Sequence, residues 1–209
     1  MKDDLAVIEF LAVMRRLRAD CPWKAAQTHR SLARYLLEET HETLEAIDTG
    51  DGAHLREELG DLLLQVFFHT VIAEQDGQFT TGDVARDIDA KMRRRNPHVF
   101  GELDGSTLDP AGVNELWEER KAEEKRRTSV TDGLPPGLPA LLYASKVLDR
   151  LERSAGTATS ELPDRHLAGA ELPSRGDIGE RLLALVAEAR ADGVDPEQAL
   201  RDAVRRRLP

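Results

Sequence analysis

The sequence has few of the features that mark exported, membrane-spanning or sheet-rich proteins. It contains one cysteine, Cys21, among 209 residues, and aromatic residues make up only 4%. A single cysteine cannot form an internal disulfide and suits a reducing compartment. The longest strongly apolar run, Leu62 to Phe68, is interrupted by Gln65 and is far shorter than the roughly 20 residues that span a bilayer. Acidic residues among the first nine positions do not fit a signal peptide, so we expect a cytoplasmic protein without a membrane partner.

The chain also lacks the surplus of basic charge that general nucleic-acid binding requires. Its 29 Lys and Arg residues are outnumbered by 39 Asp and Glu residues, which leaves a formal net charge of -10. Sequence-independent DNA binding needs a basic surface that displaces counterions. We therefore expect no direct binding of nucleic acid, although an acidic protein can still bind an anion through a metal ion.

Alternating runs of Val, Ile and Thr are missing, while Leu, Ala, Glu and Arg dominate. This composition excludes an all-β fold and predicts an all-α one. Apolar residues at three- and four-residue spacing predict helices over residues 5–17, 31–49, 53–75, 81–95, 112–127 and 140–153, with two short helices nearer the C-terminus. Only Gly50 to Gly52 separate the second helix from the third, so these two are expected to form an antiparallel hairpin. Pro22 and Pro97 are expected to end the helices that precede them.

A segment with three prolines and two glycines divides the chain into two halves. We expect a first domain over residues 1–127, a linker over 128–139 and a shortened helical region over 140–209. Within the last region, residues 154–175 are expected to be irregular. The final helix should begin after Asp195, where Gln198 is placed to complete a capping box.

A weak internal repeat links the two halves. Glu58 to Val66 and Asp177 to Leu185 share the order acid, apolar residue, glycine, acid and then an apolar helix. The second stretch is either a degenerate copy of the first or a chance similarity between two amphipathic helices. It brings no acidic partner helix with it.

The predicted hairpin carries a high concentration of negative charge. Between positions 38 and 61 there are nine acids and one strong base, Arg56; the acids are Glu38, Glu39, Glu42, Glu45, Asp48, Asp51, Glu57, Glu58 and Asp61. At 100° per residue, the apolar faces of the two helices consist of Leu32, Leu36, Leu44 and Ile47, and of Leu55, Leu59, Leu62 and Val66. Glu39 lies at the edge of the first face, and Glu58 and Asp61 lie along the margin of the second.

Four of these carboxylates are expected to converge. If the two helices pack antiparallel, Glu39 and Glu42 face Glu58 and Asp61, and four close carboxylates repel one another unless they are protonated or bridged by a cation. A hard divalent ion, Mg²⁺ or alternatively Mn²⁺, resolves that conflict and can also hold substrate phosphates. One alternative is an acidic surface that is merely solvated. Another is a di-iron carboxylate bundle, which needs a Glu-x-x-His motif on each of two helices, and the third helix lacks one.

Basic and aromatic residues farther along the chain could complement the acids. Lys91 and Arg95 lie one helical turn apart and suit phosphate oxygens. Trp117 and Lys121 pair a stacking ring with an ammonium group, and Trp23 is a second candidate for contacting a base or sugar. The alternatives are a solvated helix end and tryptophans that belong to the core.

Two acidic motifs and their surroundings indicate a family. Residues 38–42 read EExxE and residues 58–61 read ExxD; around them stand Cys21-Pro22-Trp23, Thr28-His29-Arg30-Ser31-Leu32, Arg94-Arg95-Asn96-Pro97-His98-Val99-Phe100-Gly101 and Trp117-Glu118-Glu119-Arg120-Lys121. In this combination, residues 1 to about 127 resemble the MazG family of all-α nucleoside triphosphate pyrophosphohydrolases.

The resemblance implies a MazG-like helical bundle and an Mg²⁺-dependent enzyme that hydrolyses a nucleoside triphosphate to the monophosphate and pyrophosphate, in nucleotide-pool house-cleaning. It implies the following roles: metal binding by Glu39, Glu42, Glu58 and Asp61, support of the ligands or the water by Glu38 and Glu57, and nucleotide binding by Lys91, Arg95, Trp117 and Lys121. It also implies a homodimer of helical hairpins, in which the apolar stretch Leu62 to Ile72 is buried between subunits.

Two other functions stay open. The same fold could serve as a phosphoribosyl-ATP pyrophosphatase, or as a catalytically silent helical module that binds a partner through Leu62 to Ile72. The second half resembles the second domain of longer, tandem members of the family, but it lacks the second EExxE and keeps only Asp177 and Glu180 where the second ExxD would be. We therefore expect one catalytic site.

Overall fold

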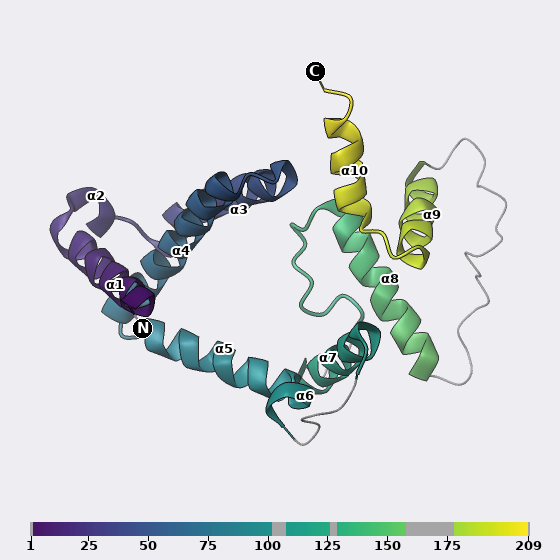
Figure 1. Cartoon of the computed structure of the whole chain (residues 1–209), viewed down its shortest axis with the longest axis horizontal. Coiled ribbons are helices and arrows are strands. Elements are labelled where there is room, and N and C mark those ends of the chain that lie inside the picture. Colours follow the sequence, from purple (N-terminus) through teal and green to yellow (C-terminus); the bar gives the residue numbers. More distant parts are fainter. Residues whose placement is uncertain (1, 102–107, 126–128, 158–177, 209) are drawn as a thin grey trace. The chain divides into compact units, whose positions relative to one another are not determined.

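The computed structural model describes residues 2–101, 108–125, 129–157 and 178–208 and contains ten helices and no strand within these ranges (Figure 1). The all-α prediction is confirmed. No helix in the described ranges is both long enough and apolar enough to cross a bilayer. The chain divides into two compact units, residues 1–121 and 122–209.

The first unit contains six helices and most of a seventh. Their bounds are α1 Lys2–Asp20, α2 Pro22–Ala25, α3 His29–Thr49, α4 Gly52–Gln75, α5 Thr81–Arg95, α6 Pro97–Phe100 and α7 Pro110–Lys125. The five long helices agree with the predicted ones to within a few residues. The single-turn helices α2 and α6 were not predicted. Pro22 and Pro97 end one helix and begin the next, because proline suits the first position of a helix.

The α3–α4 hairpin has well-defined ends. At the start of α3, the Thr28 hydroxyl accepts a hydrogen bond from the Ser31 amide and the Ser31 hydroxyl accepts one from the Thr28 amide. At its end, Gly50 has a φ of 72°, a left-handed conformation that glycine adopts without steric cost. Asp51 caps α4 by accepting from the amides of Ala53 and His54, and these bonds lower the pKa of Asp51. Two residues therefore suffice to turn the chain, and α3 packs along α4.

The core of the first unit lies where α1, α3 and α4 meet. Its buried members are Met14, Leu32, Phe67, Phe68, Val71 and Ile72. The part of the apolar stretch from Phe67 onwards is thus buried within its own chain rather than kept for a partner. Farther along, Thr70 of α4 and Thr81 of α5 share a hydrogen bond of 2.7 Å, and α5 leads away from the hairpin (Figure 1).

The hairpin departs from the predicted apolar faces. Leu36 and Ile47 of α3 and Leu59 and Val66 of α4 are exposed, with 51% of Leu59 and 54% of Ile47 accessible to solvent. The buried positions of α3 are instead Leu32, Thr43 and Ala46, and on α4 they include Glu58 and Gln65. Nearer the turn, the buried side chains of the two helices are small or polar, namely Thr43, Ala46, Glu58 and Gln65. The four exposed members of the predicted apolar faces therefore do not belong to the core of the first unit.

The second unit includes α8 Ala140–Thr157, α9 Ile178–Ala191 and α10 Pro196–Arg205, which pack against one another. Arg190 of α9 joins α9 to α8, donating to the Ser145 main-chain oxygen at 2.9 Å and to Glu152 at 2.7 Å. Only half of the capping box at α10 forms. Asp195 accepts from the Gln198 amide, but the Gln198 side chain donates to Asp202 instead. The predicted irregular stretch falls largely outside the described residues, as does Asp177; α8 continues to Thr157.

Candidate active site

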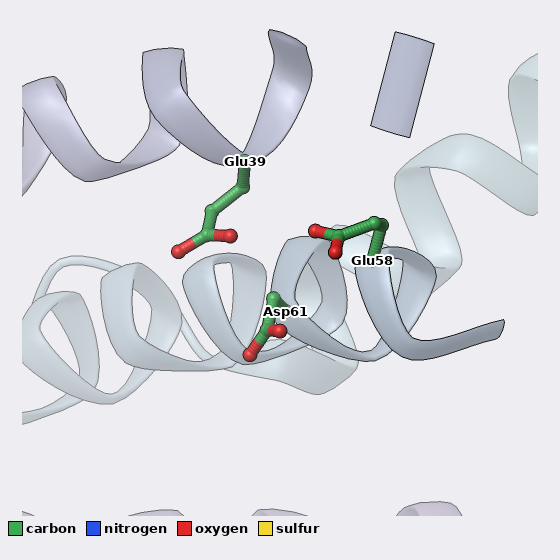
Figure 2. A group of neighbouring side chains, drawn as sticks. All are labelled: Glu39, Glu58 and Asp61. Atoms are coloured by element: carbon green, nitrogen blue, oxygen red, sulfur yellow. The ribbon is translucent and has the colours of Figure 1, made fainter. Parts of the chain in front are cut away.

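Three acidic side chains meet between α3 and α4. One oxygen each from Glu39, Glu58 and Asp61 lies within 4.8 Å of the other two, a spacing that a single metal ion can bridge. Figure 2 shows Glu39 descending from α3 toward α4, which carries Glu58 and Asp61. Only 8% of Glu58 is exposed, and the other two residues are half-buried. We call these three residues the acidic cluster.

The hairpin geometry places the cluster. Glu39 and Asp61 are almost equally distant in sequence from the Gly50–Asp51 link, so antiparallel packing brings them to the same level. Glu58 lies one turn before Asp61 on α4 and therefore on the same side of that helix. Thr43 and Ala46, which are buried in the seam, keep the two helices close enough for the carboxylates to meet.

The electrostatics of the cluster are unfavourable in the absence of a cation. Burial raises the pKa of Glu39 above its usual range, and the negative charges of Asp61 and Glu42 raise it further. A hydrogen bond from the Gln65 amide to Glu39, at 3.5 Å, acts in the opposite direction. Glu42 is exposed and lies outside the cluster, but its carboxylate is close enough to Glu39 to contribute to this shift. The structure thus brings three of the four predicted metal ligands together and places the fourth beside them.

One oxygen of Glu58 is available as a metal ligand. Glu58 Oε1 lies 3.1 Å from His54 Nε2, whereas Glu58 Oε2 is buried and has no hydrogen-bond partner in the described part of the chain. The side-chain oxygen of Gln65 is also buried and has no hydrogen-bond partner in the described part of the chain. Leaving a buried acceptor unpaired is costly, and oxygen atoms are the ligands that Mg²⁺ and Mn²⁺ prefer. The residues present therefore fit a hard divalent cation.

The two residues predicted to assist catalysis lie at the margin of this cluster. Glu38 and Glu57 are exposed and immediately precede Glu39 and Glu58 in sequence. Neither belongs to a metal-binding group of side chains within the ranges that the structure describes. They face solvent beside the cluster, where a water molecule can reach them.

The predicted nucleotide-binding residues form a second group on α5 and α7. The buried Arg95 guanidinium lies 5.2 Å from the centre of the Trp117 ring, and Lys121 forms an ion pair with Glu118 at 2.6 Å. Lys91 is half-buried one turn before Arg95. The structure thus brings Arg95 and Trp117 into contact. Among the described helices, α5 packs mainly on α4 and α6.

Trp23 lines a cavity of about 390 Å³ together with Gln27, Arg30, Ser31, Arg34 and Tyr35. Trp23 is 52% exposed. Its ring meets the Tyr35 ring edge to face, and the ring centres are 6.3 Å apart. Arg18 of α1 holds the segment that carries Trp23, donating to the main-chain oxygens of Lys24 and Gln27. The position of Trp23 thus depends on α2, which was not predicted.

Sequence reasoning missed several residues of these sites. Gln65 carried a usable signal, because it interrupts the apolar run one turn after Asp61. His54, one turn before Glu58, could have been found in the same way. Arg30 stood in the Thr28–Leu32 motif but without a role of its own, and Arg34 carried no signal; both line the cavity together with Trp23 of α2.

Comparisons with known proteins agree on one family. Residues 27–100 match the model of the MazG nucleotide pyrophosphohydrolase domain. An uncharacterized 26.1 kDa protein of Streptomyces cacaoi is 46% identical over 200 residues, which cover 94% of this chain and 77% of that protein. The nucleoside triphosphate pyrophosphohydrolase/pyrophosphatase MazG of Thermotoga maritima is 36% identical over 212 residues, covering 95% of this chain and 81% of the relative.

A third relative is longer than this chain. The nucleoside triphosphate pyrophosphohydrolase of Mycobacterium tuberculosis is 46% identical over 160 residues, which cover 76% of this chain. The match spans only 48% of the mycobacterial protein, so this chain corresponds to about half of that relative.

Proposed function

This chain belongs to the MazG family of nucleotide pyrophosphohydrolases, and we propose that it hydrolyses a nucleoside triphosphate to the monophosphate and pyrophosphate. The observation that carries the proposal is the acidic cluster with its unpaired Glu58 oxygen. We assign metal binding to Glu39, Glu42, Glu58 and Asp61, with Mg²⁺ or Mn²⁺ as the ion. The cellular role we propose is the removal of unwanted nucleotides. The lone cysteine supports a cytoplasmic location.

We assign different roles in the reaction to different groups of side chains. When bound, a divalent cation supplies charge neutralisation at the phosphates and activation of water. We assign to Glu38 and Glu57, which are exposed and directly precede Glu39 and Glu58 in sequence, the acceptance of a proton from the attacking water. Lys91, Arg95 and Lys121 donate hydrogen bonds to phosphate oxygens and stabilise the charge that develops on departing pyrophosphate.

We also propose that the active form is a homodimer that packs through the hairpin. Leu36, Ile47, Leu59 and Val66 form apolar surface on α3 and α4 that the described part of this chain leaves uncovered. A second copy could cover it and could bring its own α5 and α7 toward the acidic cluster. We call Lys91, Arg95 and Lys121 the basic group. In this arrangement the basic group of one subunit binds the substrate held at the acidic cluster of the other.

Hydrolysis in ¹⁸O-labelled water tests the reaction. Attack on the phosphorus nearest the ribose places the label in the nucleoside monophosphate and none in the pyrophosphate. Release of single phosphate together with the nucleoside diphosphate, or label in the pyrophosphate, would contradict the proposal and leave a general phosphatase.

Mixing two inactive variants tests the dimer. A Glu58→Gln subunit lacks the acidic cluster and an Arg95→Ala subunit lacks the basic group, but a mixed dimer regains one complete site if the groups come from different subunits. After subunit exchange we expect about a quarter of the wild-type activity, because half of the dimers are mixed and each has one intact site. Activity no higher than that of the separate variants would show that each subunit uses its own basic residues.

A further inference from the structure

The cavity that Trp23 lines has aromatic walls and basic charge. Of its six lining residues, Arg30 and Arg34 are basic, Trp23 and Tyr35 are aromatic, and none is acidic. An arginine side chain has five N–H donors and no acceptor. A ligand suited to this cavity therefore presents a flat ring to the aromatic residues and hydrogen-bond acceptors to the arginines.

Most of the other polar groups in the cavity are already used inside the chain. The Gln27 amide donates to the Trp23 main-chain oxygen at 3.0 Å, and the Ser31 hydroxyl donates to Gln27 at 2.7 Å. Arg34 donates to the Tyr35 hydroxyl and lies 4.5 Å from the centre of that ring. Arg30, in contrast, makes no hydrogen bond or ion pair within the described ranges, so its donors are available to a ligand.

The cavity continues the acidic cluster along α3. Ser31, Tyr35 and Glu39 follow one another at four-residue steps and so share one side of the helix. At a rise of 1.5 Å per residue, Tyr35 and Ser31 precede Glu39 by roughly 6 and 12 Å along the helix axis. If the triphosphate lies at the acidic cluster, the sugar and base of a nucleotide can extend along α3 into the cavity.

We propose that Arg30 sets the base preference of the enzyme, favouring bases whose outer edge presents acceptors, such as hypoxanthine and guanine, over adenine. The inference rests on the proposed function, because it names the substrate class of the same site. Arginine pairs with O6 and N7 of guanine through two hydrogen bonds, and hypoxanthine carries the same two acceptors. Adenine has an amino group in place of O6, so an N–H donor would meet another donor and lose a hydrogen bond.

Inosine triphosphate and ATP are a suitable substrate pair, because their bases differ in carrying oxygen or an amino group at position 6. For the wild-type protein we expect kcat/KM for inosine triphosphate to exceed that for ATP by about 10-fold or more. In Arg30→Gln the ratio should fall to within about twofold of unity, mostly through loss of activity on inosine triphosphate. Arg30→Lys keeps a donor and should retain part of the preference. Arg16→Gln, at an exposed arginine of α1 that pairs with Asp20, is the matched control and should keep the full ratio.

Binding of the two monophosphates separates this inference from the proposed function. Inosine and adenosine monophosphate bind without turnover, so equilibrium dialysis measures base preference directly, and circular dichroism checks that each variant is folded. Equal kcat/KM for both triphosphates, with pyrophosphate released from each, overturns the inference and leaves the proposed function standing. A preference that survives Arg30→Gln overturns the role of Arg30. If no triphosphate is hydrolysed, tighter binding of inosine monophosphate that Arg30→Gln abolishes still supports the inference, while the proposed function fails.

Discussion

The acidic cluster on the α3–α4 hairpin differs from the basic group on α5 and α7 in how its charges are compensated. In the cluster, carboxylates lie close to other carboxylates, and one buried oxygen of Glu58 has no partner in the described chain. In the basic group, Lys121 has the Glu118 carboxylate and Arg95 has the Trp117 ring. We therefore expect the cluster to bind an external cation, whereas a ligand of the basic group must compete with partners that the chain already provides.

The strongest test of this difference removes one carboxylate. In Asp61→Asn we expect turnover to fall by more than about 100-fold, because losing a direct ligand costs more than the roughly 10- to 100-fold effect of changing a residue that only orients a ligand. The metal-free variant should be no less stable than metal-free wild type, because Asp61 is one of the charges that disfavour ionised Glu39. The rise in melting temperature that Mg²⁺ or Mn²⁺ gives wild type should disappear.

Two further variants calibrate that result. Glu42→Gln tests the exposed fourth ligand and should lose less activity than Asp61→Asn. Glu45→Gln, at an exposed acid of α3 outside the cluster, should keep both activity and metal-induced stabilisation. If Asp61→Asn retains near-normal metal-dependent turnover, the active site lies elsewhere.

In the basic group, removing a carboxylate should strengthen substrate binding instead of weakening activity. Glu118→Gln removes the carboxylate that pairs with Lys121, so the ammonium group should become more available to phosphate oxygens. We expect KM for the triphosphate to fall by about two- to fivefold with little change in kcat, a size in keeping with a partly exposed ion pair. A rise in KM would indicate that Glu118 orients Lys121 for the substrate rather than competing with it.

A good part of this contrast could be predicted from the sequence. The short Gly50–Asp51 link and the i, i+3 spacing of Glu58 and Asp61 are enough to place both acids opposite Glu39. The buried side of α3 could not be predicted in this way, because helical periodicity marks apolar stripes without telling which one its own chain covers. Leu36 and Ile47 belong to a stripe that stays exposed.

The cavity was harder to predict, because it depends on how the backbone folds at Pro22. A proline is a signal for the end of a helix, but the same fixed φ also suits the first turn of the next one. Pro22 does both, and the resulting α2 brings Trp23 close to Tyr35. The cavity depends on that fold of the backbone and on the main-chain hydrogen bonds from Arg18, none of which leaves a periodic pattern in the sequence.

His29 and His69 are in contact in the first unit, and this pair is expected to make stability depend on pH. The rings stack with an angle of 3° between their planes, and their Nδ1 atoms are 2.7 Å apart, so one nitrogen donates to the other. Burial lowers the pKa of His69 below its usual 6.5, and the proximity of His29 lowers it further. Between the folded and unfolded pKa values the unfolded chain binds more protons, so stability is full above about pH 6.5 and is lost as the pH falls through that window.

Urea denaturation at a series of pH values checks this expectation. The free energy of unfolding of wild type should fall on acidification from neutral pH, and His69→Gln should show a smaller fall because its side chain does not titrate. His41→Gln, at an exposed histidine on α3, controls for loss of a histidine in general. Identical pH dependence in wild type and His69→Gln would show that the pair does not control acid stability.

The smallest expected effect concerns the second unit, where the repeat of the acidic motif comes without a second EExxE motif. Glu180 lies in the first turn of α9 and belongs to no metal-binding group of side chains within the described ranges. Asp177 and Glu180 supply two carboxylates, fewer than the four assigned to the first unit. Asp177→Asn combined with Glu180→Gln should therefore leave kcat within about twofold of wild type, because we assign no catalytic or metal-binding role to either residue. Metal-induced stabilisation should also be unchanged. A large loss of activity in a folded double variant would show that the second unit supplies catalytic groups, and the contrast would then lie between two working sites rather than between a site and its degenerate copy.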